Sequence, residues 1–222
     1  MNRTAAAAMA AVMPHRRFRL FASNLIRVIM RLFFRLEYQG LEHVPESGPV
    51  ILVANHTSLN DMFVIHTAIR PWIHWVSKIE LFRSRWLGSA LLKLGCIPVD
   101  RGKTDLQAAR GIFTALRNKQ VVGMFPQGTR VKPDQIAQVR PRNGSMHFAV
   151  KTGALLLPAA VSGKFRLFGK IRIVFGPPWR PDADPRAQLS TEDLDRLTLD
   201  MMRRIYSLIG VDYHLDRREK GG

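Results

Sequence analysis

Short runs of β-branched and other apolar residues alternate with helical stretches over most of the chain after Gly40. The candidate strands are residues 50–54, 73–76, 96–99, 121–125, 155–159 and 171–175. The candidate helices, from the spacing of apolar residues, are 61–69, 80–94, 104–118, 144–152 and 191–209. Such an alternation predicts an α/β fold, with a mixed, largely parallel sheet flanked by helices.

The length and composition favour one globular domain with a short appendage. The chain has 222 residues, of which 46% are apolar and 23% charged, and this balance excludes a disordered chain. We place the boundary after residue 36, so that residues 37–222 form the main domain and residues 1–36 an N-terminal segment. Cys96 is the only cysteine, which excludes an intrachain disulfide and a cysteine-rich zinc site and fits a reducing compartment.

The chain is strongly basic. Lysine and arginine number 34 against 17 acidic residues, which gives a formal charge of +17. A protein with this charge is expected to seek an anionic partner, such as acidic lipid, a phosphorylated substrate, an acidic carrier protein or nucleic acid. Nucleic acid is the partner we do not expect, because the aromatic residues sit in apolar runs and no RNP, KH or helix-turn-helix signature is evident.

The segment before Glu37 contains no acidic residue and mixes arginines with large apolar side chains. Apolar residues recur there at the helical spacings of three and four: Phe18, Phe21, Leu25, Val28, Leu32 and Leu36. Arg27, Arg31 and Arg35 follow at intervals of four on a different face. The uncharged stretches are far shorter than the ~20 residues of a membrane-spanning helix. We therefore expect an amphipathic helix that lies in the membrane interface, with Phe33 and Phe34 in the apolar layer and the arginines at anionic head groups.

Two other interpretations of this segment stay open. Its apolar face could pack on the main domain and leave the arginines in solvent. Alternatively, an acid-free and arginine-rich start is typical of a transit peptide, and residues 5–13 could form the apolar region of a weak signal peptide. We do not favour cleavage, because Arg3 is the only basic residue ahead of that region and the basic helix follows where a cleaved protein would begin.

A histidine and an aspartate follow the first candidate strand of the main domain. Residues 50–54 lead directly into Asn55-His56-Thr57-Ser58-Leu59-Asn60-Asp61, and reactive groups collect just beyond the carboxyl ends of strands in such sheets. If His56 lies in the loop and Asp61 in the first helical turn, Asp61 can orient the imidazole and leave its other nitrogen as a general base. The alternative is that Ser58 or Asp61 caps the helix and His56 is an incidental loop residue.

Two further strand ends carry arginines. The third candidate strand leads into Arg101, and the fourth into a loop with Gly128, Thr129 and Arg130. Backbone amides at a glycine, a hydroxyl and a guanidinium together suit phosphate oxygens. These strand ends therefore predict a site for a phosphorylated molecule with a reacting hydroxyl, unless the arginines are merely surface charges paired with neighbouring aspartates.

Four segments of the sequence resemble the four conserved blocks of the glycerophospholipid acyltransferase family in order and spacing. They read NHTSLND, GCIPVDR, FPQGTR and LLLPAAVSG and span roughly residues 36–180. The resemblance is strongest to the bacterial 1-acyl-sn-glycerol-3-phosphate acyltransferases. It implies a glycerol-phosphate acyltransferase fold at the cytoplasmic face of the cell membrane, held there peripherally or monotopically. It also implies transfer of a fatty acyl group from acyl-coenzyme A or acyl carrier protein to the sn-2 hydroxyl of lysophosphatidate.

The resemblance assigns roles to individual residues. His56 is similar to the general base of the family and Asp61 to its orienting partner. Arg101 and the third block resemble contacts to the acceptor phosphate; the third-block residues are Gln127, Gly128, Thr129 and Arg130. Pro158 and Lys78 resemble positions that bind the acyl donor or shape the site. Gly128 and its neighbours are candidate backbone donors to the oxyanion of the transition state. The acyl donor is a co-substrate, and the resemblance implies no further cofactor.

Gln127 departs from the family pattern, which usually has glutamate at this place. Glutamine keeps the shape and the hydrogen-bonding capacity of glutamate but loses its charge. A same-fold acyltransferase that acts on another lyso-lipid, such as lyso-ornithine lipid, therefore stays open, and a non-catalytic basic membrane-binding protein is a remote alternative. No metal site is expected, because the seven histidines show neither HExxH nor Cys-His spacing.

Overall fold

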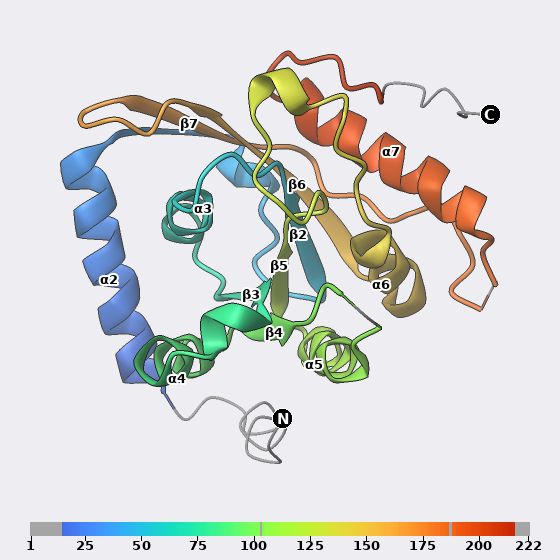
Figure 1. Cartoon of the computed structure of the whole chain (residues 1–222), viewed down its shortest axis with the longest axis horizontal. Coiled ribbons are helices and arrows are strands. Elements are labelled where there is room, and N and C mark those ends of the chain that lie inside the picture. The colour runs from blue at the N-terminus through green and yellow to red at the C-terminus, as the bar shows by residue number, and fades with distance from the viewer. Residues whose placement is uncertain (1–14, 103, 187, 216–222) are drawn as a thin grey trace.

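The computed structural model describes residues 15–102, 104–186 and 188–215, and its described strands form one seven-stranded sheet (Figure 1). The strand order is β1-β7-β6-β2-β5-β3-β4, and every neighbouring pair is parallel except β6 and β7. The strands are β1 (Arg35–Gln39), β2 (Val50–Ala54), β3 (Ile73–Lys78), β4 (Ile97–Val99), β5 (Val121–Met124), β6 (Leu155–Gly163) and β7 (Lys170–Phe175). The mixed, largely parallel sheet that the sequence predicts is confirmed.

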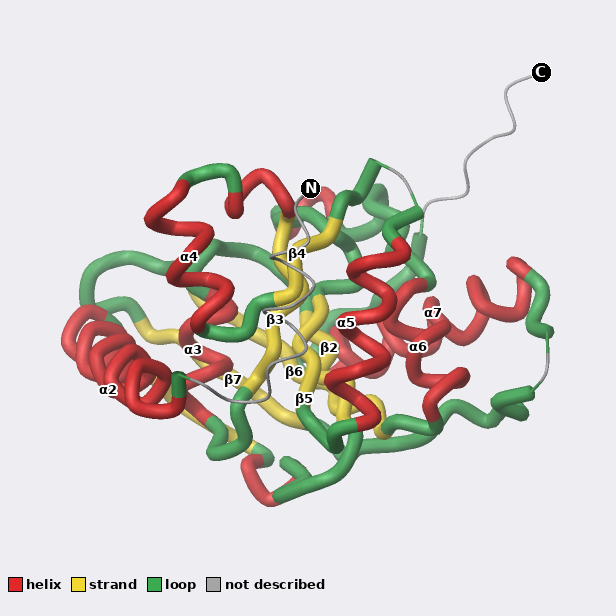
Figure 2. The backbone as a smooth tube through the Cα atoms, turned by 90° about the horizontal axis from the view of Figure 1, so that it is seen from below, coloured by secondary structure: helices red, strands yellow, loops and turns green. Residues whose placement is uncertain are grey.

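Helices cover both faces of this sheet (Figure 2). One face carries α2 (Arg16–Phe33), α3 (Asp61–Ala68) and α4 (Arg85–Lys93), and the other carries α5 (Leu106–Arg117), α6 (Gly144–Thr152) and α7 (Thr191–Ser207). Three short 3-10 helices lie in the connections: η1 (Leu41–His43), η2 (Ile79–Phe82) and η3 (Pro133–Gln135). Each face buries its own apolar cluster, so the central strand β2 is buried at every residue. Strands buried on both faces read as continuous apolar runs, which is why the sequence revealed them.

Three elements differ from the sequence prediction. The N-terminal helix ends at Phe33, and β1 pairs in parallel with β7, so Arg35 belongs to the sheet. The predicted helix 80–94 is divided into η2 and α4, because the Ser84 side chain accepts from Leu87 N and begins a new helix. The predicted strand 155–159 continues to Gly163, where a hairpin turns the chain into β7.

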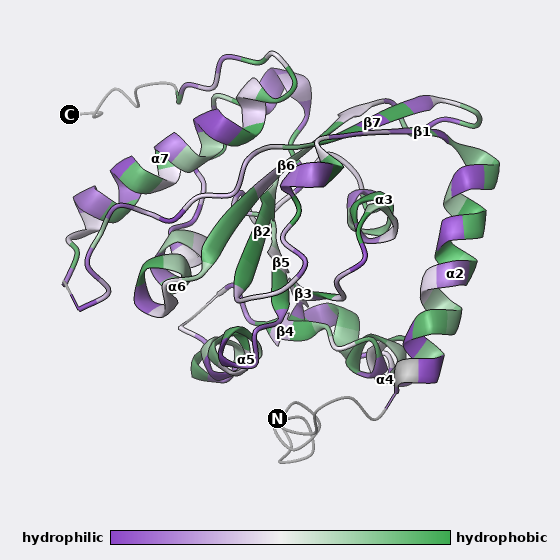
Figure 3. Ribbon diagram, turned by 180° about the vertical axis from the view of Figure 1, so that it is seen from behind, coloured by the Kyte–Doolittle hydropathy of each residue, from purple (hydrophilic) through white to green (hydrophobic). Residues whose placement is uncertain are grey.

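Helix α2 mixes hydrophobic and hydrophilic residues along its length (Figure 3). One face packs on the domain through the buried side chains of Arg19 and Met30. A second face exposes a stripe of large apolar side chains: Phe18, Phe21, Leu25, Val28, Ile29, Leu32 and Phe33. Arg17 and Arg31 are exposed beside this stripe. The apolar stripe that the sequence indicated therefore does not pack against the described part of the domain.

Other expectations about the N-terminal segment can be placed individually. Phe34 is half-buried, with its ring edge-on to Phe165 at 5.3 Å, so it belongs to the core and not to an exposed apolar layer. Arg27 is half-buried and Arg35 is exposed at the start of β1. The possible signal-peptide region at residues 5–13 lies outside the described residues. Within the described residues, every helix is too short or too polar to cross a bilayer.

Candidate functional site

The site lies where the carboxyl ends of parallel strands meet at one edge of the sheet. Strand β2 leads into the loop with His56, β4 leads into Arg101, and β5 leads into the loop that contains Gly128. The strand order places β5 directly beside β2 and β3 between β5 and β4. The sheet therefore brings together the histidine and the arginine-bearing loops, as the sequence predicts.

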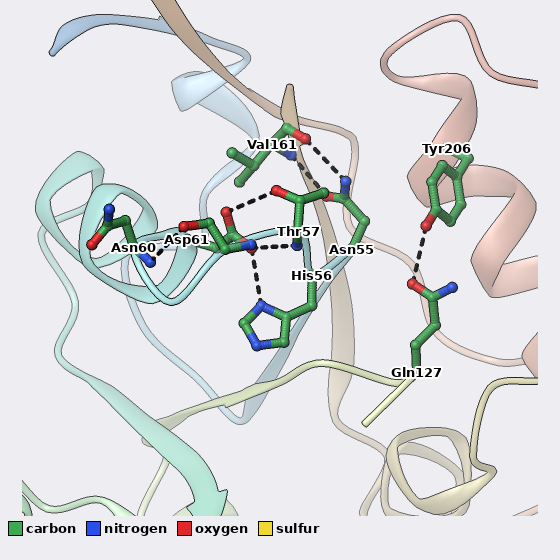
Figure 4. A network of polar contacts seen from close by, with 9 residues as sticks. Asn55, His56, Thr57, Asn60, Asp61, Gln127, Val161 and Tyr206 are labelled. Atoms are coloured by element: carbon green, nitrogen blue, oxygen red, sulfur yellow. Dashed lines mark hydrogen bonds and ion pairs between the residues drawn. The ribbon is translucent and has the colours of Figure 1, made fainter. Parts of the chain in front are cut away.

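His56 and Asp61 form the central polar contact of the site (Figure 4). His56 lies in the loop after β2, and Asp61 is the first residue of α3. The imidazole Nδ1 lies 2.9 Å from Asp61 Oδ2, and the Asp61 side chain is fully buried while that of His56 is 16% exposed. A carboxylate at this position fixes Nδ1 as the protonated nitrogen, which leaves Nε2 as the acceptor. Among the described residues, Nε2 has no hydrogen-bond partner.

The backbone of the loop holds Asp61 in place. Thr57 N and Ser58 N donate to Asp61 Oδ2 at 2.6 and 2.7 Å, and the Thr57 hydroxyl donates to Oδ1 at 3.2 Å (Figure 4). A buried carboxylate needs such donors, because burial removes its hydration. The helix N-terminus also favours negative charge. Asp61 therefore both begins α3 and orients His56, so the capping interpretation and the catalytic one are compatible.

An aromatic stack packs against the face of the His56 imidazole ring. The ring of Phe125 lies parallel to that of His56, with 4.0 Å between centroids, and Trp75 stacks on Phe125 at 5.0 Å. Phe125 follows β5 and Trp75 belongs to β3, so two strands contribute. The stack and the hydrogen bond to Asp61 together fix both the plane and the rotation of the imidazole. Neither aromatic residue was singled out from the sequence, because their contact depends on the strand order.

Asn55 anchors the His56 loop to β6. Its Nδ2 donates to Val161 O at 2.9 Å, and its Oδ1 accepts from Val161 N at 2.8 Å (Figure 4). The side-chain amide thus continues the pairing of β2 and β6 beyond the end of β2. On the other side of the loop, Val131 N donates to His56 O at 2.7 Å. These contacts hold the backbone of His56 between two neighbouring segments.

Three loops meet around Arg101 and Gly128. Arg101 Nη1 donates to the Gly128 carbonyl, and Arg142 Nη1 donates to the Arg101 carbonyl at 3.1 Å. Burial, with repulsion from Arg142 as the second cause, lowers the pKa of the Arg101 guanidinium, which stays charged at neutral pH. Gly128 has a φ of +67°, in the left-handed region that favours glycine. Arg101, Gly128 and Arg142 therefore lie together, and Arg142 is a residue that the sequence did not single out as part of the site.

Gln127 does not point into this cluster. It is 4% exposed, and its Oε1 accepts a hydrogen bond from the Tyr206 hydroxyl of α7 at 3.0 Å. Figure 4 shows the Gln127 side chain directed towards α7 and away from His56. In this structure the polar contact of Gln127 is therefore with α7, and its contact with the acceptor phosphate stays a prediction.

The remaining candidate residues differ in their exposure and in their contacts. Thr129 and Arg130 are exposed on the loop after β5. Lys78 ends β3 and forms an exposed ion pair with Glu80 at 3.2 Å. Pro158 is buried inside β6, paired in register with Val53, so it shapes the sheet beside the site. Gly128 N donates to Phe125 O at 2.9 Å, so in this structure its amide is used within the turn, and its role as an oxyanion donor stays a prediction.

An apolar cavity of about 500 Å³ opens beside the site. Phe125 lines it and also stacks on His56, and Arg101 and Arg142 lie at the same cavity. Its other walls come from apolar side chains of β3, β4, β5, α5 and α6: Val76, Val99, Met124, Ile112, Phe113 and Phe148. Such a lining suits an alkyl chain, and the arginines suit an anion. Across residues 15–102, 104–186 and 188–215 there is no cluster of three metal-ligating side chains.

Comparison with known proteins decides the family. A family model described as Acyltransferase matches residues 35–162, which include β1, the His56 loop, both arginine-bearing loops and most of β6. The chain belongs to the acyltransferase family. It is therefore an enzyme of acyl transfer, and the polar groups described above lie within the matched region and are its candidate active site.

Two relatives cover most of this acyltransferase. The 1-acyl-sn-glycerol-3-phosphate acyltransferase of Bacillus subtilis is 30% identical over 194 residues, which are 85% of this chain and 95% of the relative. The crystal structure of the 1-acyl-sn-glycerophosphate acyltransferase PlsC from Thermotoga maritima matches with a TM-score of 0.63 and 25% identity, over 90% of this chain and 85% of the other. The mouse 1-acyl-sn-glycerol-3-phosphate acyltransferase alpha is 28% identical over 72% of this chain, which spans 56% of the mouse protein.

Proposed function

We propose that this acyltransferase transfers a fatty acyl group from a thioester donor to the sn-2 hydroxyl of 1-acyl-sn-glycerol-3-phosphate, giving phosphatidate. The observation that carries the proposal is the His56–Asp61 pair beside a cavity that combines apolar walls with two arginines. These groups match the three parts of the substrates: a hydroxyl to deprotonate, a phosphate and an alkyl chain. The names of the relatives support this choice of acceptor.

The reaction needs one proton acceptor and no covalent enzyme intermediate. His56 Nε2 takes the proton of the acceptor hydroxyl as its oxygen attacks the thioester carbonyl. The tetrahedral intermediate collapses, the thiolate leaves, and the imidazolium returns the proton to the thiolate. Asp61 stabilises the imidazolium through Nδ1, at the 2.9 Å contact already present. No cofactor beyond the acyl donor is proposed, since the thioester is already activated.

The arginines and the cavity divide the binding of the substrates. Arg101, Arg142 and the exposed Arg130 supply charge for the phosphate of the acceptor, and a guanidinium binds phosphate oxygens in bidentate fashion. The apolar cavity next to Phe125 suits a fatty acyl chain. Gln127 gives no reason to prefer another acceptor, because it faces Tyr206 and not the arginines. The assay described below determines whether the donor is acyl-coenzyme A or acyl carrier protein.

We also place the enzyme at the cytoplasmic face of the cell membrane, as a peripheral or monotopic protein. The exposed apolar stripe of α2 with arginines beside it supports this location, since such helices bind anionic bilayer surfaces. The formal charge of +17 also favours binding to an anionic membrane surface.

The test is an acyl-transfer assay on the purified full chain with long-chain acyl-coenzyme A and acyl carrier protein as alternative donors. The acceptors are 1-acyl-sn-glycerol-3-phosphate, the same lipid without its phosphate, and a lyso-ornithine lipid. We expect turnover of the phosphate-bearing acceptor and at least a hundredfold lower kcat/KM without the phosphate, since several charge-assisted hydrogen bonds are lost. Equal turnover with and without the phosphate would contradict the proposal.

A further inference from the structure

The hairpin between β6 and β7 ends in a tip with an unusual mixture of side chains. Residues 164–170 read KFRLFGK, with three basic residues and no acidic one. Leu167 and Phe168 at the turn are 61% and 62% exposed, while Phe165 is half-buried in the core. Two adjacent large apolar side chains exposed among cations are rare on a surface that meets only water.

The backbone at the tip favours this exposure. Phe168 has a φ of +56°, in the left-handed region that bulky residues seldom adopt. Phe168 N donates to Phe33 O at 2.7 Å, and Arg35 N donates to Gly169 O at 2.9 Å. The end of α2 therefore holds the tip in its unfavourable conformation. Strain of this kind persists where the surrounding structure imposes it, and it often accompanies function.

The tip continues the exposed apolar stripe of α2. The stripe ends at Leu32 and Phe33, and Phe33 is hydrogen-bonded to Phe168. Figure 1 shows the hairpin tip beside the C-terminal end of α2, far from α7. Because β6 runs parallel to β2, the tip projects from the same edge of the sheet as His56. A surface that the stripe contacts therefore meets the tip as well, on the side where substrates enter.

We infer that the β6–β7 tip is a second membrane-binding element, which inserts Leu167 and Phe168 into the interface of an anionic phospholipid bilayer beside α2. Lys164 and Arg166 are exposed beside the two apolar side chains and meet the lipid phosphates, while Lys170 at the start of β7 is paired with Glu37 at 2.7 Å. This mixture fits such a surface, because apolar side chains are favoured at the boundary of the acyl chains and cationic side chains at the anionic head groups. This inference rests on the membrane location proposed above. The contacts made by α2 and by the tip lie on either side of β1. Together they hold the enzyme in one orientation, in which the end of the sheet that carries His56 faces the lipid.

A single fluorescent label tests the inference in the full chain. Cys96 is 4% exposed, and burial raises the pKa of its thiol to about 12, so it does not react with a thiol probe in the folded protein. Leu167→Cys can therefore be labelled selectively with an environment-sensitive dye. Leu41→Cys is the matched control, because Leu41 is 43% exposed and lies in η1, which follows the end of β1 that is farther from the tip. A label at Val28→Cys on the exposed stripe of α2 reports on the helix.

With vesicles of phosphatidylglycerol and phosphatidylcholine, we expect a blue shift and quenching by bromolipids at positions 167 and 28, and neither at position 41. The unlabelled double variant Leu167→Ser/Phe168→Asn should partition about tenfold more weakly into these vesicles, with unchanged turnover of detergent-dispersed substrates. Asparagine is chosen because it tolerates the positive φ.

Each contrary outcome has its own meaning. A shift at position 28 without one at position 167 would overturn the inference and leave the role of α2 intact. No shift at any position would overturn both membrane assignments while the acyl-transfer assay still tested the chemistry. An equal shift at position 41 would mean non-specific adsorption and would also overturn the inference.

Discussion

At the scale of single residues, the candidate active site contains groups that are each held by at least two contacts. His56 is fixed by Asp61 and Phe125, and Asp61 by the amides of its own loop. A general base gains from such restraint, because a small misplacement of the reacting atoms costs orders of magnitude in rate.

The pair Gln127–Tyr206 offers a test of how the loop after β5 is held. Tyr206→Phe leaves the buried Gln127 amide without the hydroxyl that it accepts from, and we expect it to lower the free energy of unfolding by about 1–2 kcal/mol. Tyr213→Phe is the matched control, because the Tyr213 hydroxyl is buried without a partner among the described residues. We expect that variant to be neutral or more stable, and urea denaturation measures both. Equal losses in the two variants would contradict this account.

At the scale of elements, helix α2 has one face that packs on the domain and a separate exposed apolar face, which we propose contacts a membrane. Its buried face includes Arg19, whose Nε donates to Lys93 O at 3.0 Å and whose guanidinium lies over the Trp72 ring. This polar anchor explains how α2 docks with so much of its apolar surface left outside. Substitutions on the exposed stripe are therefore expected to change membrane binding and not folding.

Leu25→Ser/Val28→Ser tests that separation. These side chains are 47% and 62% exposed, and we expect the double variant to bind anionic vesicles at least tenfold more weakly, as apolar area is lost from the interface. Its thermal unfolding midpoint should stay within about 2 °C of the wild type, because exposed substitutions seldom destabilise. Vesicle sedimentation measures the binding, with Leu41→Ser as the control. A large fall in the midpoint would show instead that the stripe packs against protein.

Elements that are marked by a local pattern of residues could be predicted from the sequence. Elements that are defined by contacts between distant residues could not. Strand β2 and its neighbours are continuous apolar runs, and His56 and Asp61 are five residues apart at a strand end, so both could be predicted. β1 could not, because its half-buried residues continue the apolar spacing of α2 and only pairing with β7 makes them a strand. The stacking of Phe125 on His56 and the turning of Gln127 towards Tyr206 join residues far apart in the chain.

At the scale of the whole molecule, half-buried His66 and buried His74 are expected to make stability depend on pH. Burial lowers the pKa of His66 to about 4. Burial also lowers the pKa of His74. The unfolded chain takes up protons on these groups below pH ~6.5, while folded His66 stays neutral until about pH 4. The free energy of unfolding therefore falls as the pH drops through this window, by about 3 kcal/mol from His66.

Urea denaturation at pH 7.5, 6, 5 and 4.5 measures this dependence. We expect His66→Gln to have a flatter profile than the wild type, because the substitution removes the group that binds protons only in the unfolded state. His214→Gln is the control, since His214 is exposed. Parallel profiles for His66→Gln and the wild type would refute the assignment.

The central claim is that His56, held by Asp61, is the general base of acyl transfer to the phosphate-bearing acceptor. The most direct measurement compares kcat for 1-acyl-sn-glycerol-3-phosphate and acyl-coenzyme A, or acyl carrier protein where that is the donor, between the wild type, His56→Ala and the exposed-site control His214→Ala. The account predicts a fall of about 10²–10⁴-fold for His56→Ala with an unaltered circular dichroism spectrum, and no change for His214→Ala. A folded His56→Ala variant that kept wild-type kcat would contradict it.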